Sequence, residues 1–234
     1  MTEEEKKKIS EEIAHVREKL AAASDGRDVD LLLATKTVPP EKIAYAVREC
    51  GVTLIGENRV NELLEKYEQI KDLPCGLHFI GTLQTNKVKY IIDKVKLIHS
   101  VDSEKLLYEI NRQAEKHDLT MDVLIEINIG REENKGGILP EDLPEFIDKA
   151  LSYPRVRVRG LMTIAPKCEE KDEYRKFFTQ TYQMSLDILQ KKLHNIDSPV
   201  LSMGMSNSYE IAAACGATLV RVGSAVFGAR TYPT

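Results

Sequence analysis

The sequence predicts a single (β/α)8 TIM barrel, in which eight parallel strands close into a cylinder covered by helices. Three observations carry this prediction. Eight short apolar runs alternate with seven charged stretches of helical period, and no two runs follow each other as a hairpin. Such strand–helix units form parallel sheets, and a count of eight favours a closed barrel over an open doubly wound sheet. No G-x-G-x-x-G follows the first run, which weakens the dinucleotide-binding form of the open sheet.

The first element is an amphipathic helix at about residues 3–23, which we expect to pack on the barrel. One face of this helix carries four apolar residues at helical spacing: Ile9, Ile13, Val16 and Leu20. A Ser-Asp-Gly turn at residues 24–26 then ends the helix.

The strands and helices of the barrel follow in strict alternation. The eight predicted strands are Asp30–Thr35, Thr53–Ile55, Leu77–Ile80, Leu97–Ser100, Asp122–Ile127, Val158–Met162, Val200–Ser202 and Leu219–Val222. The seven helices between them are Glu41–Glu49, Arg59–Ile70, Lys87–Asp93, Glu104–His117, Glu141–Ala150, Glu173–His194 and Tyr209–Cys215. No Pro/Gly/Ser-rich linker divides them, so we expect one domain over residues 1–234.

Composition excludes several classes of function. The 33 basic and 37 acidic residues are mixed along the chain and leave a net charge of −4, which argues against nucleic-acid binding. The four cysteines form no C-x-x-C pair and no metal-like spacing with the five histidines, so we expect no zinc site and reduced thiols. A charged N-terminus and the absence of a long apolar run indicate neither a secretory signal nor a membrane span. We expect a cytoplasmic protein, with a monomer as the default state.

The first candidate for chemistry is Lys36, because barrel active sites lie at the carboxyl ends of the strands. Lys36 ends the first apolar run. Partial burial at the barrel mouth would lower its pKa, and a neutral amine can form a Schiff base with an aldehyde. The alternative is that Lys36 only marks the point where the strand leaves the core.

The loops after the last two strands are the second candidate. Asn207 and Glu210 have the spacing of a capping box, which would leave the Ser206 hydroxyl for a ligand. After the eighth strand, Gly223 permits close backbone approach, and Ser224 offers a hydroxyl and an amide. Barrels commonly bind phosphate at these two loops. The alternative is that both are ordinary tight turns.

A reactive amine beside a phosphate site suits a phosphorylated aldehyde, either pyridoxal 5′-phosphate (PLP) or the substrate of a sugar-phosphate aldolase. Arg221 closes the eighth strand beside the phosphate loop and could donate a hydrogen bond to a pyridine nitrogen. Because arginine keeps its proton, the pyridine nitrogen would stay unprotonated and the ring would be a poor electron sink. The alternative for Arg221 is an ion pair with a carboxylate.

Six sequence blocks resemble the pyridoxal phosphate homeostasis proteins, single-domain relatives of the alanine racemase N-terminal barrel (fold type III PLP). These blocks are Ala34–Thr37, Gly56–Arg59, His78–Lys87, Gly160–Met162, Leu201–Ser206 and Arg221–Gly228, and the resemblance runs from about residue 9 to 230. It implies that Lys36 is the Schiff-base lysine, that Ser206, Gly223 and Ser224 hold the phosphate, that Arg221 faces the pyridine nitrogen and that Asn58 lies beside the ring. The chain departs from the family at Ser208, where an aspartate is usual.

The resemblance also bears on catalysis. Racemases of this fold take a second proton donor, a tyrosine, from another domain and a partner subunit, and we expect neither here. Two-base racemisation needs a donor on each face of the substrate. The sequence therefore favours a protein without strong catalysis that buffers or delivers PLP, with PLP-dependent apo-enzymes as candidate partners. The alternative is a weak amino-acid racemase. We expect His78 to be a hydrogen-bonded core histidine and the 131–137 loop to be mobile and without a catalytic role.

Overall fold

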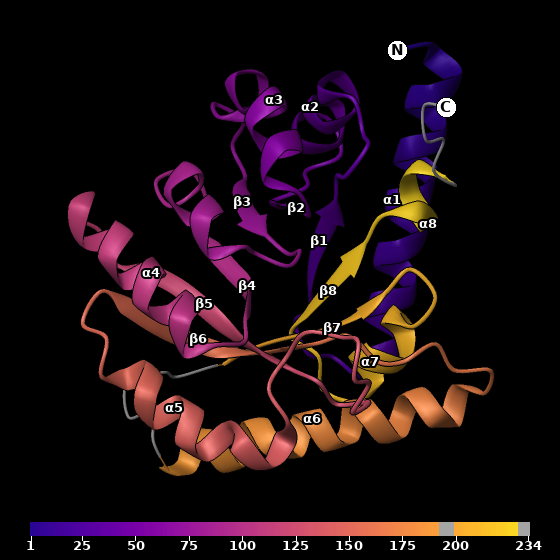
Figure 1. The fold of residues 1–234 in the computed structure, drawn as a ribbon. Helices are drawn as coiled ribbons and strands as arrows, with labels where there is room; N and C mark the ends of the chain where they lie inside the picture. The colour runs from indigo at the N-terminus through magenta and orange to yellow at the C-terminus, as the bar shows by residue number, and fades with distance from the viewer. Residues whose placement is uncertain (192–198, 229–234) are drawn as a thin grey trace.

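The computed structural model describes residues 1–191 and 199–228, and it confirms the predicted barrel (Figure 1). All strands are parallel and pair in chain order, and the first closes the barrel against the eighth. The strands are β1 (Asp30–Ala34), β2 (Leu54–Glu57), β3 (Gly76–Phe79), β4 (Leu97–Val101), β5 (Met121–Ile127), β6 (Val156–Thr163), β7 (Val200–Met205) and β8 (Leu219–Val222).

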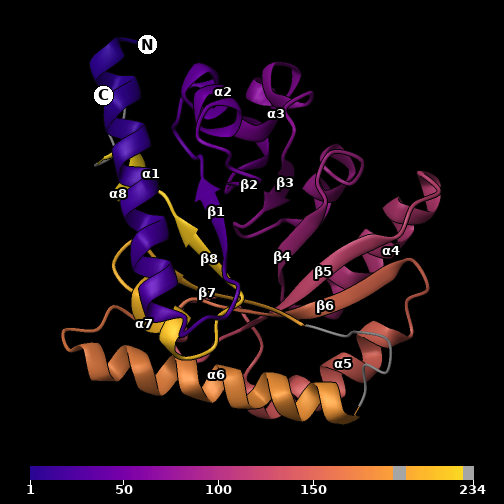
Figure 2. The same cartoon turned by 180° about the vertical axis from the view of Figure 1, so that it is seen from behind.

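Helices cover the outside of this barrel. They are α1 (Glu3–Ala23), α2 (Pro40–Arg48), α3 (Val60–Ile70), the 3₁₀ helix η1 (Thr85–Tyr90), α4 (Glu104–Lys116), the 3₁₀ helix η2 (Pro140–Asp142), α5 (Leu143–Leu151), α6 (Lys171–Lys191), α7 (Tyr209–Ala214) and α8 (Ser224–Phe227). Both views of the molecule show α1 running alongside α7 and α8 (Figures 1 and 2). The predicted face of α1 is the buried one.

One helical prediction needs correction, and one short helix has no counterpart among the predictions. The segment predicted as a helix over residues 87–93 forms the 3₁₀ helix η1 instead, which begins at Thr85; short connectors often take this tighter form. The four-residue helix α8 was not predicted, because it is shorter than any amphipathic period. The predicted end of the long sixth helix at His194 lies outside the described residues.

Alternate residues of the strands face different environments. The larger apolar cluster lies between strands and helices and includes Leu33 and Ile98. Their neighbours Leu32 and Leu97 belong instead to two small clusters inside the barrel. Five polar side chains share this interior parity on their strands and are buried: His78, His99, Glu126, Ser202 and Arg221. A barrel interior is normally filled by branched apolar residues, so this polar group calls for an explanation.

Two further observations concern the described residues alone. Within the described ranges, no helix combines the length and the apolar character that crossing a bilayer requires. In the same ranges, no group of three or more His, Cys, Asp or Glu side chains is arranged to hold a metal ion. All four cysteines are described, and all are free thiols.

Candidate functional site

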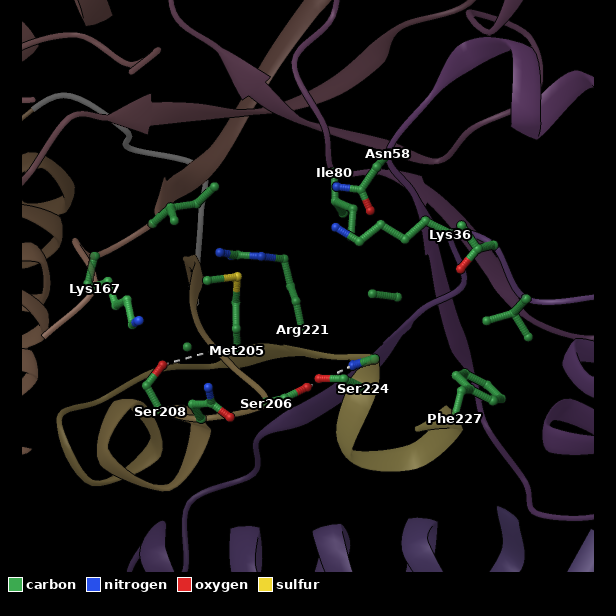
Figure 3. Close-up of a pocket in the computed structure, with 18 of the residues that line it drawn as sticks. Lys36, Asn58, Ile80, Lys167, Met205, Ser206, Ser208, Arg221, Ser224 and Phe227 are labelled. Atoms are coloured by element: carbon green, nitrogen blue, oxygen red, sulfur yellow. Dashed lines mark hydrogen bonds between the residues drawn. The ribbon is translucent and has the colours of Figure 1, made fainter. Parts of the chain in front are cut away.

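A cavity of about 570 Å³ opens at the carboxyl ends of the strands (Figure 3). Its walls come from the segments that follow β1, β2, β3, β5, β6, β7 and β8. The structure brings all six predicted site residues to this one cavity: Lys36, Asn58, Ser206, Arg221, Gly223 and Ser224. Residues separated by up to 188 positions in sequence (36 to 224) therefore share one site.

Lys36 lies two residues beyond the end of β1, and its side chain extends into the cavity (Figure 3). The backbone on both sides of it is held by neighbouring side chains. Lys66 Nζ donates to the Thr35 carbonyl at 2.8 Å, and the Thr37 N–H donates to the Glu62 carboxylate. Thr37 has φ +62°, a left-handed conformation that is uncommon outside glycine. These contacts fix the turn that aims Lys36.

A buried ion pair behind β2 supplies part of this support. Glu57 is 0% exposed and accepts from Thr35 Oγ1 at 2.7 Å and from Lys66 Nζ at 3.0 Å. Burial raises the pKa of Glu57, and the charge of Lys66 opposes that rise. Because the partner charge of a buried ion is what keeps it tolerable, Lys66 both neutralises Glu57 and anchors Thr35.

Asn58 follows β2, and its amide lines the cavity. Its Oδ1 is buried and has no hydrogen-bond partner in the described structure. A Cβ at Gly81 would overlap the Asn58 carbonyl, so the loop after β3 needs a glycine to pack against this residue. A buried oxygen without a partner costs about 1–3 kcal/mol. A ligand group that donates to it would recover that cost.

The loops after β7 and β8 are joined through Ser206. Its Oγ accepts from the backbone N–H of Gly223 at 3.2 Å and of Ala225 at 3.3 Å. A Cβ at Gly223 would lie 3.1 Å from the Ala34 carbonyl oxygen, so glycine lets this loop approach β1. The prediction that the Ser206 hydroxyl is unengaged is therefore wrong for its oxygen. Its hydrogen has no acceptor among the described residues.

The predicted capping box at Asn207 is also wrong. The residue that precedes the first turn of α7 is Ser208, and its side chain does not cap that helix. Ser208 Oγ instead accepts from the Met205 N–H at 3.2 Å, which tightens the turn. Gly204 makes the turn possible, because its φ is +88° and a Cβ there would lie 2.5 Å from Ala212 Cβ.

Arg221 is the most deeply buried of the six site residues, at 4% exposure. Nη1 donates to the carbonyl and hydroxyl oxygens of Ser202 at 2.9 and 2.6 Å, and Nη2 donates to the Thr163 carbonyl at 2.9 Å. Within residues 1–191 and 199–228 it forms no ion pair, so the alternative of a carboxylate partner is not what the structure has. Burial lowers the pKa of Arg221 to about 10, partly offset by the charge of Glu126. The residue is a buried cation held by neutral acceptors.

The 131–137 loop contributes a residue that the sequence analysis did not select. Lys135 lines the cavity, as do Lys42 and Lys167. The loop is tied to the barrel by Asn128, which exchanges two hydrogen bonds with the backbone of Glu132 at 2.9 and 3.0 Å. Basic side chains thus surround the cavity, which favours an anionic ligand. No sequence signal singled out Lys135, because loop lysines are ordinarily solvated.

Comparisons with protein families, known proteins and solved structures each find relatives of this chain. Residues 10–231 match the family described as the alanine racemase N-terminal domain. A pyridoxal phosphate homeostasis protein of Aquifex aeolicus (strain VF5) is 46% identical over 226 residues, covering 96% of this chain and 98% of that protein. PipY of Synechococcus elongatus PCC7942, solved with PLP bound, has a TM-score of 0.83 at 31% identity, covering 94% of this chain and 100% of that one. An alanine racemase of Clostridium difficile 630 shares the fold, with a TM-score of 0.72 at 16% identity over 96% of this chain and 58% of that one.

Proposed function

Because this chain belongs to the family of the pyridoxal phosphate homeostasis proteins, we propose that its cavity binds pyridoxal 5′-phosphate. In this proposal Lys36 holds the cofactor covalently as a Schiff base, with loss of one water. The protein buffers or delivers the cofactor instead of using it for rapid catalysis. We place it in the cytoplasm, which its four free thiols support.

The observation that carries the proposal is the composition of one cavity. It contains the Lys36 amine, the joined loops of Ser206 and Gly223, and the buried guanidinium of Arg221 (Figure 3). An aldehyde, a phosphate and an aromatic nitrogen acceptor would each meet a matching group there. Lys36 supplies the nucleophile, the loops with Ser224 supply hydroxyl and amide donors, and Arg221 supplies a donor that keeps its proton.

Two features of the described residues fit the cofactor independently of the family. The first is the buried Asn58 Oδ1 without a hydrogen-bond partner. The second is the buried cation of Arg221, whose three hydrogen bonds use three of its five N–H groups. A buried cation without a counter-ion is costly, and an anionic ligand in the cavity would lower that cost.

The test is a titration of the purified protein with PLP, followed by visible absorption. We expect a band that the free cofactor lacks, and we expect Lys36→Ala to abolish it. Lys89→Ala is the matched control, because Lys89 is an exposed lysine outside the cavity lining. A colourless wild-type protein would instead favour a sugar-phosphate aldolase, and a band that persists in Lys36→Ala would contradict the assignment of the amine.

A weak amino-acid racemase remains the second candidate, and one observation favours it. Tyr174 lines the cavity, and its hydroxyl accepts from the Cys168 N–H at 3.3 Å. A tyrosine hydroxyl is a suitable second proton donor, and the sequence analysis did not identify it. Steady production of D-alanine from L-alanine, lost in both Lys36→Ala and Tyr174→Phe, would favour the racemase over the carrier.

A further inference from the structure

A chain of hydrogen bonds crosses the barrel interior and ends at Arg221. His78 on β3 contacts His99 on β4, with Nδ1 and Nε2 3.0 Å apart. His99 Nδ1 lies 3.0 Å from Ser202 Oγ on β7, and Arg221 Nη1 on β8 donates to the same oxygen at 2.6 Å. In the closed barrel β4 and β7 are not neighbours. The His99–Ser202 contact therefore crosses the barrel interior between two strands that do not pair.

The direction of each hydrogen bond follows from Arg221 and from the partners of Ser202. Arginine only donates, so Ser202 Oγ accepts from Nη1. Among the described residues, His99 Nδ1 is the only other group within hydrogen-bond distance of this hydroxyl, so we assign the hydroxyl hydrogen to the bond with His99 Nδ1. A neutral His99 that accepts at Nδ1 carries its proton on Nε2, and it must donate to His78 Nδ1. His78 then carries its proton on Nε2, the atom that faces Gly76 at the start of β3. Arg221 and Ser202 thus set the direction of three hydrogen bonds.

Both histidines are neutral near pH 7, as this pattern requires. Burial lowers the pKa of His78 to about 4. Burial, with the charges of His78 and Arg221, lowers the pKa of His99 well below its ordinary 6.5. The chain cannot relay a proton, because its last member keeps its own. The role of these hydrogen bonds is therefore to hold and polarise the guanidinium of Arg221.

We propose that His99, acting through Ser202, is a positioning residue that fixes the guanidinium of Arg221 toward the cofactor. This inference rests on the proposed function for its consequence, since the oriented group would contact bound PLP. Without His99, the Ser202 hydroxyl loses the acceptor for its hydrogen and can rotate, and the bond to Nη1 loses its fixed geometry. Hydrogen bonds to charged groups contribute more than neutral ones. Loosening the bond between Ser202 and Nη1 should therefore change how Arg221 is presented to PLP.

The test compares four variants of the full chain loaded with PLP. We expect His99→Ala and Ser202→Ala to shift the visible band and to weaken PLP binding about tenfold or more, the loss for one charged hydrogen bond. His99→Gln, whose amide can accept from Ser202 and donate to His78, should restore both. Ile98→Ala is the control, because Ile98 is the neighbour of His99 on β4 and lies in the outer apolar cluster, on the opposite face of the strand; it should lower stability while leaving the band unchanged.

A second measurement needs no cofactor and separates this inference from the proposed function. In the ¹⁵N NMR spectrum of the cofactor-free protein we expect His99 as the Nε2–H tautomer, and slowly rotating Arg221 Nη groups that become mobile in His99→Ala. If the wild type fails to bind PLP, the proposed function is wrong and these signals alone decide the inference. An Nδ1–H tautomer, immobile Nη groups in His99→Ala, or an unchanged cofactor band in a folded His99→Ala protein would overturn it.

Discussion

Lys36 and Arg221, the two cationic residues of the cavity that the sequence predicts, are supported in different ways. At Lys36 the described contacts act on the backbone of its neighbours, through a buried charged group of Lys66, Glu57 and Glu62. At Arg221 they act on the guanidinium itself, through neutral acceptors. The first kind of support fixes the turn that carries Lys36. The second fixes the donors of Arg221, which in the proposed function must be presented to the ligand in one geometry.

The largest change in stability is expected in the charged group that supports the turn of Lys36. Lys66→Met removes the cation beside Glu57, which is 0% exposed. We expect a loss of about 3–5 kcal/mol in the free energy of unfolding, because an unpaired charge stays buried. Denaturant unfolding measures it. The double variant Glu57→Gln/Lys66→Met should recover most of the loss. A Lys66→Met protein as stable as wild type would show that the ion pair does not stabilise the fold by this amount.

Arg221 would not be held by neutral acceptors alone if the Glu126 carboxylate were a permanent counter-ion for its guanidinium. Burial, together with the Asp102 carboxylate, raises the pKa of Glu126 from 4.5 to about 7. A raised pKa contributes stability that is present below about pH 4.5 and is lost as the pH rises through about 7. The free energy of unfolding should fall by about 3 kcal/mol over this pH range.

Unfolding measured across this pH range checks the prediction, with Glu126→Gln as the comparison. We expect the substitution to flatten the fall in stability between pH 4.5 and pH 7. An unaltered slope would mean that Glu126 is ionised throughout, and Arg221 would then have a fixed counter-charge after all.

A smaller effect is expected at Asn58 in the cavity wall. Asn58→Ala removes the buried Oδ1 that has no partner, so the cofactor-free protein should lose at most about 1 kcal/mol. With PLP bound, the variant should lose part of the ligand-induced rise in Tm. Thermal unfolding with and without PLP measures both. Asn86→Ala, an exposed asparagine, is the control, and an equal Tm rise in wild type and Asn58→Ala would remove Asn58 from the site.

Sequence reasoning reached the barrel and the candidate site because both follow local rules. Apolar runs with helical stretches between them set the strand order, and the rule that chemistry lies at strand ends selected Lys36 and Arg221. The same rule reaches the turn that contains Asn58, and the resemblance to a family singled that residue out. Strand ends differ from the predictions by a residue or two in most cases, and by three at Met205.

The parts that escaped prediction depend on contacts between distant segments. His99 and Ser202 are 103 positions apart, and each alone reads as an ordinary polar residue in an apolar run. Ser206 Oγ is engaged by a loop that begins 17 positions later. The cap at α7 was misplaced by one residue, since Asn207 and Ser208 are both good cap residues and the turn at Gly204 decides between them.

The central claim is that one amine, Lys36, captures the aldehyde of PLP in this cavity. Borohydride reduction of the PLP-loaded protein converts a Schiff base into a stable secondary amine, and peptide mass spectrometry then locates the added mass. The account predicts the label on the peptide that contains Lys36, and none in Lys36→Ala. A label on Lys42, Lys135 or Lys167, the other lysines of the cavity wall, would contradict it.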